Sequence, residues 1–256
     1  MLLNRRTLMK QAATAATLAA AMDAKANAVG RVSAIKAIAF DGFVIFDLRP
    51  IAALAETLFP GRGQDLAAAW KSRQFEYTWL RTLMNNYVDF WRVTDEALTF
   101  AGAQTGLDIT LPKRMQLMEL FLNLKAWPDV LPTLTTLRQA GIRLAFLNNF
   151  SSSMLDANIK SAGLQGFFEE HLSTDRVGAY KPDPRAYQMG PDHFKLPRDQ
   201  IAFAAFGGWD AAGAKKFGYW TYWCDRLGVP KEVLGVSPDA TGTGLAELLK
   251  QLDIGK

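Results

Sequence analysis

The chain has 256 residues, 49% of them apolar and 21% charged, a composition typical of a folded globular protein and not of a disordered or collagen-like one. Its net charge of +4 comes mainly from residues 1–28, so the remainder is nearly neutral and nucleic acid is not an expected partner. One cysteine and two histidines exclude a disulfide framework and leave little for zinc chemistry or a Ser-His-Asp triad.

The N-terminal segment has the pattern of an export signal. Arg5 and Arg6 precede a short, alanine-rich apolar run, and small residues follow at Ala26 and Ala28, the −3 and −1 positions of a signal-peptidase site. The paired arginines predict the twin-arginine route, with residues 1–28 as signal peptide and a mature, periplasmic or otherwise exported protein that begins near Val29. The alternative is an amphipathic helix that belongs to the fold. The apolar run is too short to span a bilayer, so no membrane contact is expected after signal removal.

Four short apolar runs predict the strands of a parallel sheet. They cover residues 34–40, 143–147, 201–206 and 219–224, and each is mainly apolar, as strands buried on both faces are. Helical patterns at 130–140, 152–162 and 210–217 alternate with these runs, and each is followed or closed by a glycine. This alternation predicts an α/β fold with a doubly wound parallel sheet.

Residues 48–125 break the alternation. Apolar side chains recur there at helical steps, and residues 94–105 and 112–124 also have a helical pattern. We therefore expect a helical cap subdomain at 48–125, inserted after the first strand of a core domain made of residues 29–47 and 126–256. The residues of the first recurring pattern are Leu66, Trp70, Tyr77, Leu80 and Met84.

The candidate chemistry lies where the strands end. Ligands of an open parallel sheet bind beyond the carboxyl ends of its strands, and Asp41, Asn148 with Asn149, and Asp210 follow three of the predicted strands. Lys181 lies in a turn-rich loop between the second and third of them. A carboxylate can attack carbon or phosphorus to form an ester, and a neighbouring ammonium keeps it ionised. A nucleophilic aspartate with two supporting charges is therefore expected.

Four motifs resemble those of a known family. Over residues 34–250 the chain is similar to the haloacid dehalogenase superfamily, and within it to the type II (S)-2-haloacid dehalogenases. The resemblance implies a Rossmann-like core with a helical cap, and a hydrolase that displaces halide from a 2-haloalkanoic acid through an aspartyl ester to give the 2-hydroxy acid, with no metal or cofactor. The motifs are Ala39-Phe40-Asp41, Gln74-Phe75-Glu76-Tyr77-Thr78-Trp79-Leu80-Arg81, Tyr180-Lys181-Pro182-Asp183 and Trp209-Asp210-Ala211-Ala212-Gly213-Ala214.

The resemblance also assigns roles to individual residues. Asp41 matches the nucleophile, Lys181 the lysine that stabilises it, and Asp210 the acid that positions the lysine and the hydrolytic water. Asn149 matches a residue of the halide cradle, and Tyr187 a tyrosine near the lysine. The full set of substrate- and halide-binding positions is Lys71, Asn148, Asn149, Phe43, Phe90, Tyr187 and Trp209.

Several polar contacts of that family are altered here, and the loop after Asp41 is one residue shorter than usual. Losing a hydrogen bond to a charged group costs about 1.5–3 kcal/mol, so together these changes leave the substrate open. The replacements are Val44 for a threonine, Lys71 for the arginine that grips the halide, Asn148 for a serine that binds the substrate carboxylate, Ala205 for another serine and Gly207 for an asparagine.

Two alternatives stay open beside a dehalogenase. A phosphatase of the superfamily carries a second aspartate two residues after the nucleophile, where this chain has Phe43, which cannot transfer a proton. The altered contacts are the reason for the second alternative, a non-catalytic or repurposed exported protein on the same scaffold. The expected partner is a small-molecule carboxylate. A homodimer is also expected, because related dehalogenases are commonly dimers and the cap carries Trp70, Tyr77 and Trp79.

Overall fold

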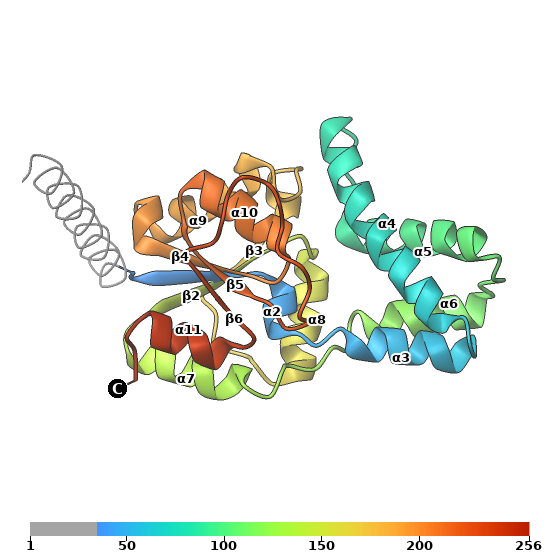
Figure 1. Ribbon diagram of the computed structural model, residues 1–256, viewed down its shortest axis with the longest axis horizontal. Coiled ribbons are helices and arrows are strands. Elements are labelled where there is room, and N and C mark those ends of the chain that lie inside the picture. Colours follow the sequence, from blue (N-terminus) through green and yellow to red (C-terminus); the bar gives the residue numbers. More distant parts are fainter. Residues whose placement is uncertain (1–34, 256) are drawn as a thin grey trace, which may run out of the picture.

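The computed structural model describes residues 35–255 (Figure 1). The predicted signal peptide and the predicted start near Val29 lie outside these residues. Within 35–255, no helix combines the length and the apolar character needed to cross a membrane.

The described residues form a six-stranded parallel sheet in the order β3-β2-β1-β4-β5-β6, which confirms the predicted fold class. β1 lies in the middle, where Phe40 pairs with Phe146 of β2 on one side and with Ala204 of β4 on the other. The strands are β1 (Ala37–Phe40), β2 (Arg143–Asn148), β3 (His171–Ser173), β4 (Ile201–Ala205), β5 (Trp220–Cys224) and β6 (Ala240–Gly242).

Helices cover both faces of the sheet (Figure 1). α9 (Pro184–Phe194) and α10 (Gly208–Phe217) lie on one face, and α7 (Val130–Gln139), α8 (Ser152–Ala162) and α11 (Leu245–Gln251) on the other. Side chains of β1 alternate between the two layers: Ile38 and Phe40 join one hydrophobic cluster, Ala37 and Ala39 the other. Burial on both faces is why β1 and β4, and most of β2 and β5, are apolar.

Two strands have no counterpart in the sequence prediction. β3 and β6 are three residues long and form the edges of the sheet, and each includes a residue that is not buried. A strand this short, with one face partly solvated, leaves no continuous apolar run, so periodicity cannot identify it.

Four helices that come after β1 and the one-turn helix at residues 42–45 lie beyond the end of the sheet toward which β1 runs (Figure 1). They pack mainly on one another: the Trp70 indole of α4 donates to the Thr94 carbonyl of α5 at 2.8 Å. The apolar pattern read from the sequence is buried at Leu66 and Trp70 but exposed at Leu80 (45%). The helices are α3 (Arg49–Leu58), α4 (Gly63–Leu83), α5 (Phe90–Thr105) and α6 (Leu111–Leu120).

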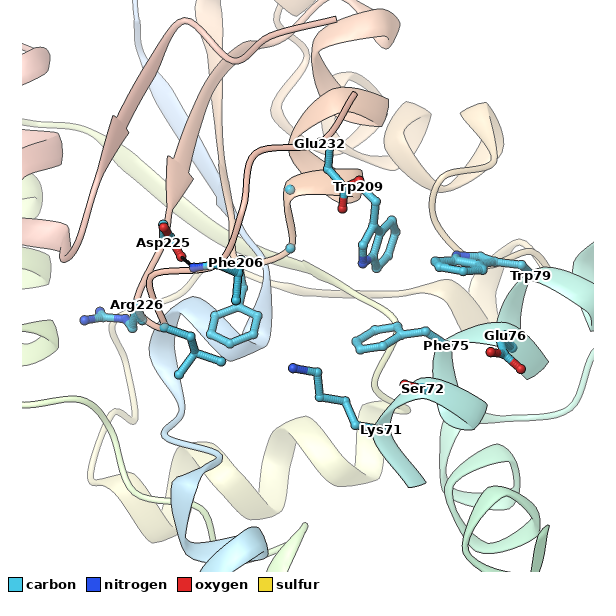
Figure 2. Close-up of a pocket in the computed structure, with 14 residues that line it drawn as sticks. Lys71, Ser72, Phe75, Glu76, Trp79, Phe206, Trp209, Asp225, Arg226 and Glu232 are labelled. Carbon is cyan, nitrogen blue, oxygen red and sulfur yellow. Dashed lines mark hydrogen bonds between the residues drawn. The ribbon is translucent and has the colours of Figure 1, made fainter. Parts of the chain in front are cut away.

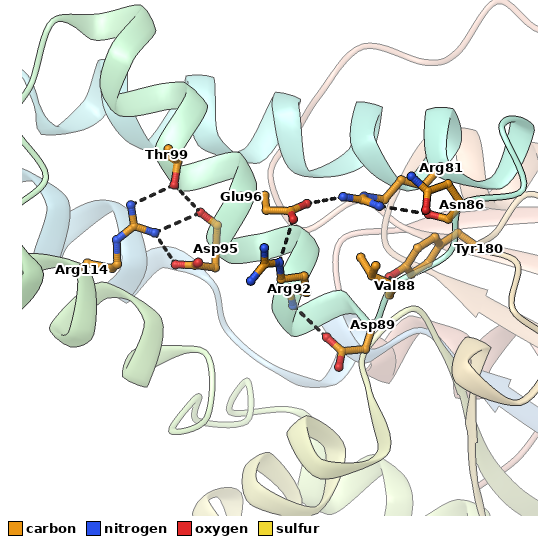
Figure 3. Close-up of polar contacts among 10 residues, drawn as sticks. All are labelled: Arg81, Asn86, Val88, Asp89, Arg92, Asp95, Glu96, Thr99, Arg114 and Tyr180. Carbon is orange, nitrogen blue, oxygen red and sulfur yellow. Dashed lines mark hydrogen bonds and ion pairs between the residues drawn. The ribbon is translucent and has the colours of Figure 1, made fainter.

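Polar contacts tie these helices together and to the core (Figure 3). Glu96 of α5 accepts from Arg81 of α4 and from Arg92, its neighbour one turn away. Across the junction, the Tyr180 hydroxyl donates to the Val88 carbonyl at 2.6 Å. Tyr180 immediately precedes Lys181, so the helical cap is anchored beside a predicted site residue.

Candidate active site

Asp41 directly follows β1 and is the N-cap of the one-turn helix α2 (Gly42–Ile45). Its Oδ2 accepts from the Phe43 backbone N–H at 3.2 Å, and its Oδ1 accepts from Lys181 Nζ at 2.8 Å. Only 6% of the residue is exposed. Both oxygens are therefore oriented by the protein, and the carboxylate lies at the carboxyl end of the central strand, where an open sheet binds its ligands.

Lys181 is fully buried and joins two acidic residues that are far apart in the chain. Its ammonium donates to Asp41 and, at 2.6 Å, to Asp210 Oδ2, and it lies 5.1 Å from the ring centroid of Phe203. The Lys181 backbone N–H donates to Asn149 Oδ1 at 3.1 Å, which fixes the loop that carries the lysine. The structure thus brings together the three residues predicted as catalytic.

Asp210 lies in the first turn of α10 and is buried beneath the lysine. The Tyr187 hydroxyl of α9 donates to Asp210 Oδ1 at 2.6 Å, so each carboxylate oxygen of Asp210 has its own donor. Tyr187 and Asp210 therefore form the lower end of a chain of contacts that leads through Lys181 to Asp41.

Burial and neighbouring charges shift the pKa values of this chain of groups. Burial raises the pKa of Asp210 to about 6, and the Asp41 carboxylate adds to the effect while Lys181 opposes it. Burial alone lowers the pKa of Lys181, but the two carboxylates outweigh it and hold that pKa above its ordinary value. Burial also raises the pKa of Tyr187 well above its ordinary value, so this hydroxyl remains a donor.

Asn148 presents a buried donor beside the nucleophile. Its Oδ1 accepts from the Phe150 backbone N–H at 3.2 Å, while its Nδ2 has no hydrogen-bond partner among the described residues. A Cβ placed on Gly42 would lie 1.9 Å from that Nδ2, so the amide occupies space that is open only because residue 42 is glycine. Burying an unpartnered N–H is costly, and an anionic ligand next to Asp41 would satisfy it.

An aromatic cluster encloses the other side of the nucleophile. The Phe43 ring makes edge contacts with Phe75, Phe150 and Phe206, at centroid distances of 6.3, 4.9 and 5.8 Å. Phe90 is fully buried and contacts Phe150 at 5.4 Å. This wall leaves Asp41 in surroundings of low polarity, which strengthen its electrostatic interactions.

A cavity of about 310 Å³ opens between the cap and the core (Figure 2). Phe75 and Trp79 of α4 face Trp209, with ring centroids 5.4 and 5.3 Å from it. Lys71, also on α4, extends its ammonium into this space toward Phe206 (Figure 2). The structure therefore places Lys71 and Trp209 at the cavity, on the cap side and the core side respectively.

Sequence reasoning did not single out Phe75, Trp79 or Phe206 as site residues. The first two belong to the motif at residues 74–81, and Phe206 is the last residue of a predicted strand. Phe75 and Trp79 follow Lys71 by one and two helical turns, and Phe206 comes shortly before Trp209. This spacing could have indicated that they line the same site. Among residues 35–255, no three or more His, Cys, Asp or Glu side chains gather as a metal site would require.

Comparisons with known proteins agree on one family. A sequence model of the haloacid dehalogenase-like hydrolases matches residues 11–218. Haloacetate dehalogenase H-2 of Moraxella sp. (strain B) is 40% identical over 81% of this chain and 93% of its own length. The (S)-2-haloacid dehalogenase of Pseudomonas sp. (strain YL) is 39% identical over 84% and 94%. The L-2-haloacid dehalogenase of Xanthobacter autotrophicus, solved with chloropropionic acid covalently bound, has a TM-score of 0.79 and 29% identity, covering 86% of this chain and 98% of that one.

Proposed function

The chain belongs to the haloacid dehalogenase-like hydrolases, and on that basis we propose that it hydrolyses (S)-2-haloalkanoic acids to 2-hydroxy acids, with Asp41 as nucleophile. It is a hydrolase that acts on carbon–halogen bonds, as its relatives are. The observation that carries the residue assignment is the buried contact chain in which Lys181 joins Asp41 to Asp210, at 2.8 and 2.6 Å.

In the first step, an Asp41 carboxylate oxygen attacks C2 of the substrate. A carbon–oxygen bond forms while the carbon–halogen bond breaks with its electron pair, so halide leaves and C2 is inverted. Lys181 pairs with the Asp41 carboxylate before the attack and, with the Phe43 N–H, holds it in one orientation.

In the second step, water attacks the carbonyl carbon of the aspartyl ester. The Asp41 carboxylate and the 2-hydroxy acid are released, and the water gives up one proton overall. After alkylation Asp41 is uncharged, so Lys181 pairs with Asp210 alone and one of the two causes that raise the pKa of Asp210 is removed, while its burial remains. Asp210 is the carboxylate left to accept the proton that the attacking water gives up, and it positions that water and Lys181.

The substrate carboxylate and the halide are assigned to polar side chains near Asp41 and at the cavity, beginning with a donor that has no hydrogen-bond partner among the described residues. The unpartnered Asn148 Nδ2 takes the substrate carboxylate, in place of the hydroxyl expected at this position. The departing halide is assigned to Lys71, which lines the cavity, and to Asn149, which holds the Lys181 backbone. Tyr187 holds Asp210, Trp209 is an apolar wall of the cavity, and Phe43 and Phe90 are the apolar walls around Phe150.

Neither alternative is favoured. A phosphatase would need a proton donor at position 43, where a phenylalanine packs against three other rings. Against a non-catalytic protein stands the buried lysine that bridges two carboxylates, because burying these charges carries a desolvation cost that an apolar core of the same volume would not have.

Halide release from 2-chloropropionate, 2-bromopropionate and chloroacetate tests the proposal. We expect release from the S enantiomers that persists in EDTA, and no phosphate release from phosphate esters with magnesium. Single turnover in oxygen-18 water should label Asp41. Label that enters the hydroxy acid directly, with unlabelled Asp41, means that water attacks the substrate and the nucleophile is wrongly assigned.

We further propose that the protein is exported by the twin-arginine route, as Arg5, Arg6 and the Ala26-Asn27-Ala28 site support. N-terminal sequencing of protein from the native host should give a start near Val29, and an intact Met1 would contradict export.

A homodimer is proposed from the surface of the cap. Leu83 and Met84, at the end of α4, are 79% and 62% exposed, and Leu111 and Met115 of α6 are also exposed. Trp70 does not contribute, since it is buried within the cap. Light scattering at micromolar concentration should give twice the chain mass, and a monomer mass would reject the dimer.

A further inference from the structure

The one-turn helix α2, which begins immediately after Asp41, ends in carbonyls that its own residues cannot satisfy. A helix leaves its last carbonyls without internal partners, and α2 has no basic residue in its last turn. The Gly42 carbonyl is bonded by the Phe46 N–H at 2.8 Å. The next three carbonyls, of Phe43, Val44 and Ile45, all accept from segments remote in sequence.

Trp127 provides two of these bonds. Its indole N–H donates to the Phe43 carbonyl at 3.3 Å, and its backbone N–H donates to the Ile45 carbonyl at 3.0 Å. An isolated bridge between Phe46 and Ala126 continues the contact. The segment that precedes α7 therefore lies along α2 and holds its far end.

Arg226, in the loop after β5, provides the third. Its Nε and Nη2 both donate to the Val44 carbonyl, at 3.0 and 2.9 Å. The side chain is 5% exposed, and its guanidinium lies over the Trp127 ring, 4.7 Å from the centroid. Although Arg226 borders the cavity, Figure 2 shows its guanidinium directed away from the space that Lys71 enters.

Asp129 fixes the orientation of this arginine. It pairs with Arg226 at 3.0 Å, and its Oδ2 also accepts from the Leu245 N–H at 2.6 Å, where α11 begins. The carboxylate thus holds both terminal nitrogens of the guanidinium, Nη1 at 3.2 Å and Nη2 at 3.0 Å, and links it to the starts of α7 and α11. A planar guanidinium held by an acid, a ring and a carbonyl has little freedom to rotate.

We propose that Arg226 is a positioning residue for the nucleophile, which it orients through α2. The inference rests on the proposed function, since it concerns the reactivity of Asp41. The Val44 carbonyl is held by Arg226, the Phe43 carbonyl by Trp127, and the Phe43 N–H in turn holds Asp41 Oδ2. If the Val44 carbonyl is released, α2 tilts and Asp41 loses its alignment with the attacked carbon.

This role has a particular reason in this chain. Val44 has no hydroxyl with which to bond its surroundings. Arg226 bonds to the backbone instead, so the contact is independent of the side chain at position 44. A misplacement of about 1 Å at a reacting group can lower the rate about a hundredfold. A small movement of the end of α2 should therefore have a large effect on the rate of attack by Asp41.

The chain offers a matched control in a second arginine that contacts the same ring. The Arg49 guanidinium also lies over Trp127, at 4.6 Å, but its polar contacts are with Asp47 and not with α2. Arg226→Met and Arg49→Met each remove one guanidinium from Trp127, and only the first frees the Val44 carbonyl. Arg226→Lys keeps the charge without the paired donors.

Single-turnover halide release, normalised to the folded fraction, measures ester formation on Asp41. For Arg226→Met we expect a loss of about a hundredfold in this rate constant with KM changed little, a smaller loss for Arg226→Lys, and near-native values for Arg49→Met. A loss that disappears on normalisation, or an equal loss in Arg49→Met, overturns the proposal.

Amide hydrogen exchange over residues 42–46 provides a readout that does not need turnover. We expect faster exchange there in Arg226→Met and unchanged exchange in Arg49→Met. Unchanged exchange in Arg226→Met overturns the inference whatever the activity. If exchange is faster in Arg226→Met but the native protein releases no halide from any 2-haloacid, the proposed function is overturned. The conclusion that Arg226 holds α2 is then still supported.

Discussion

The core side and the cap side of the site are built differently. On the core side, Asp41, Lys181 and Asp210 are buried and bonded to one another before any substrate is present. On the cap side, Lys71 is exposed and extends into a cavity without a hydrogen bond or ion pair to any residue in the described part of the chain.

The difference separates attack by the nucleophile, on the core side, from recognition of the substrate and its leaving halide, on the cap side. A buried network is costly to assemble and is paid for in folding, so its groups are already oriented when substrate arrives. An exposed lysine on a helix is not fixed by buried contacts, so replacing it costs the fold little stability. Changes on the core side should therefore lower turnover for every substrate, and changes on the cap side should alter binding and preference.

The strongest test of the core side is Asp41→Asn. The change is nearly isosteric, so the fold should persist, but the amide is a poor nucleophile and halide release should fall about 10⁴-fold or more. Intact-mass analysis must exclude deamidation at position 41. Residual activity within tenfold of native protein, with the amide intact, would show that Asp41 does not attack the substrate.

Lys181→Met should lower turnover by about 10³-fold and also destabilise the fold. It leaves two carboxylates buried without their cation, and breaking a buried ion pair costs about 3–5 kcal/mol. The control is Lys215→Met, which breaks the partly exposed pair with Asp239 and should cost about 1 kcal/mol or less. Urea unfolding of both variants checks the contrast, and equal losses would contradict the buried network.

The pH dependence of the core side follows from Asp210. Because burial raises its pKa from 3.8 to about 6, kcat/KM should fall as pH drops below 6 and this group takes up a proton. Stability should move the other way: the raised pKa favours the folded state below pH 3.8, and this contribution is lost as pH rises through 6. Asp210→Asn should remove both effects and lower kcat. If kcat/KM of this variant still falls at low pH, the titrating group is another member of the coupled cluster and not Asp210.

How much of this the sequence predicts differs between the two sides. Asp41, Lys181 and Asp210 follow from strand ends and a loop motif, because parallel strands place their carboxyl ends together. The exposed Leu80 and Met84 were expected to share a face with buried Leu66, and helical periodicity cannot show where a helix passes beyond its partners. The Arg226 contact with the Val44 backbone has no sequence signal, because any residue offers a carbonyl.

Asn148→Ala tests the junction of the two sides. It removes the free Nδ2 that faces Gly42 and is assigned to the substrate carboxylate. A lost hydrogen bond to a charged group costs about 1.5–3 kcal/mol, so KM should rise about tenfold to a hundredfold with kcat less affected. Asn148→Ser, which restores a hydroxyl donor, should recover part of the loss. An unchanged KM would mean that the carboxylate binds elsewhere.

The smallest expected effect, and the most direct test of the cap side, comes from Lys71→Arg. A guanidinium offers a planar set of donors where the ammonium is a single strongly hydrated charge, so it should stabilise a departing halide better. We expect a several-fold rise in kcat/KM, larger for 2-chloropropionate than for 2-bromopropionate because chloride is the poorer leaving group. Lys71→Met should lower both rates. Since Lys71 is exposed and unpaired, unfolding free energies should stay within about 0.5 kcal/mol of native protein in both variants. Halide release with each substrate checks the ordering. Equal rates for all three forms would show that the cap-side charge takes no part in halide departure. The groups that bind the halide would then have to belong to the core side, together with the nucleophile.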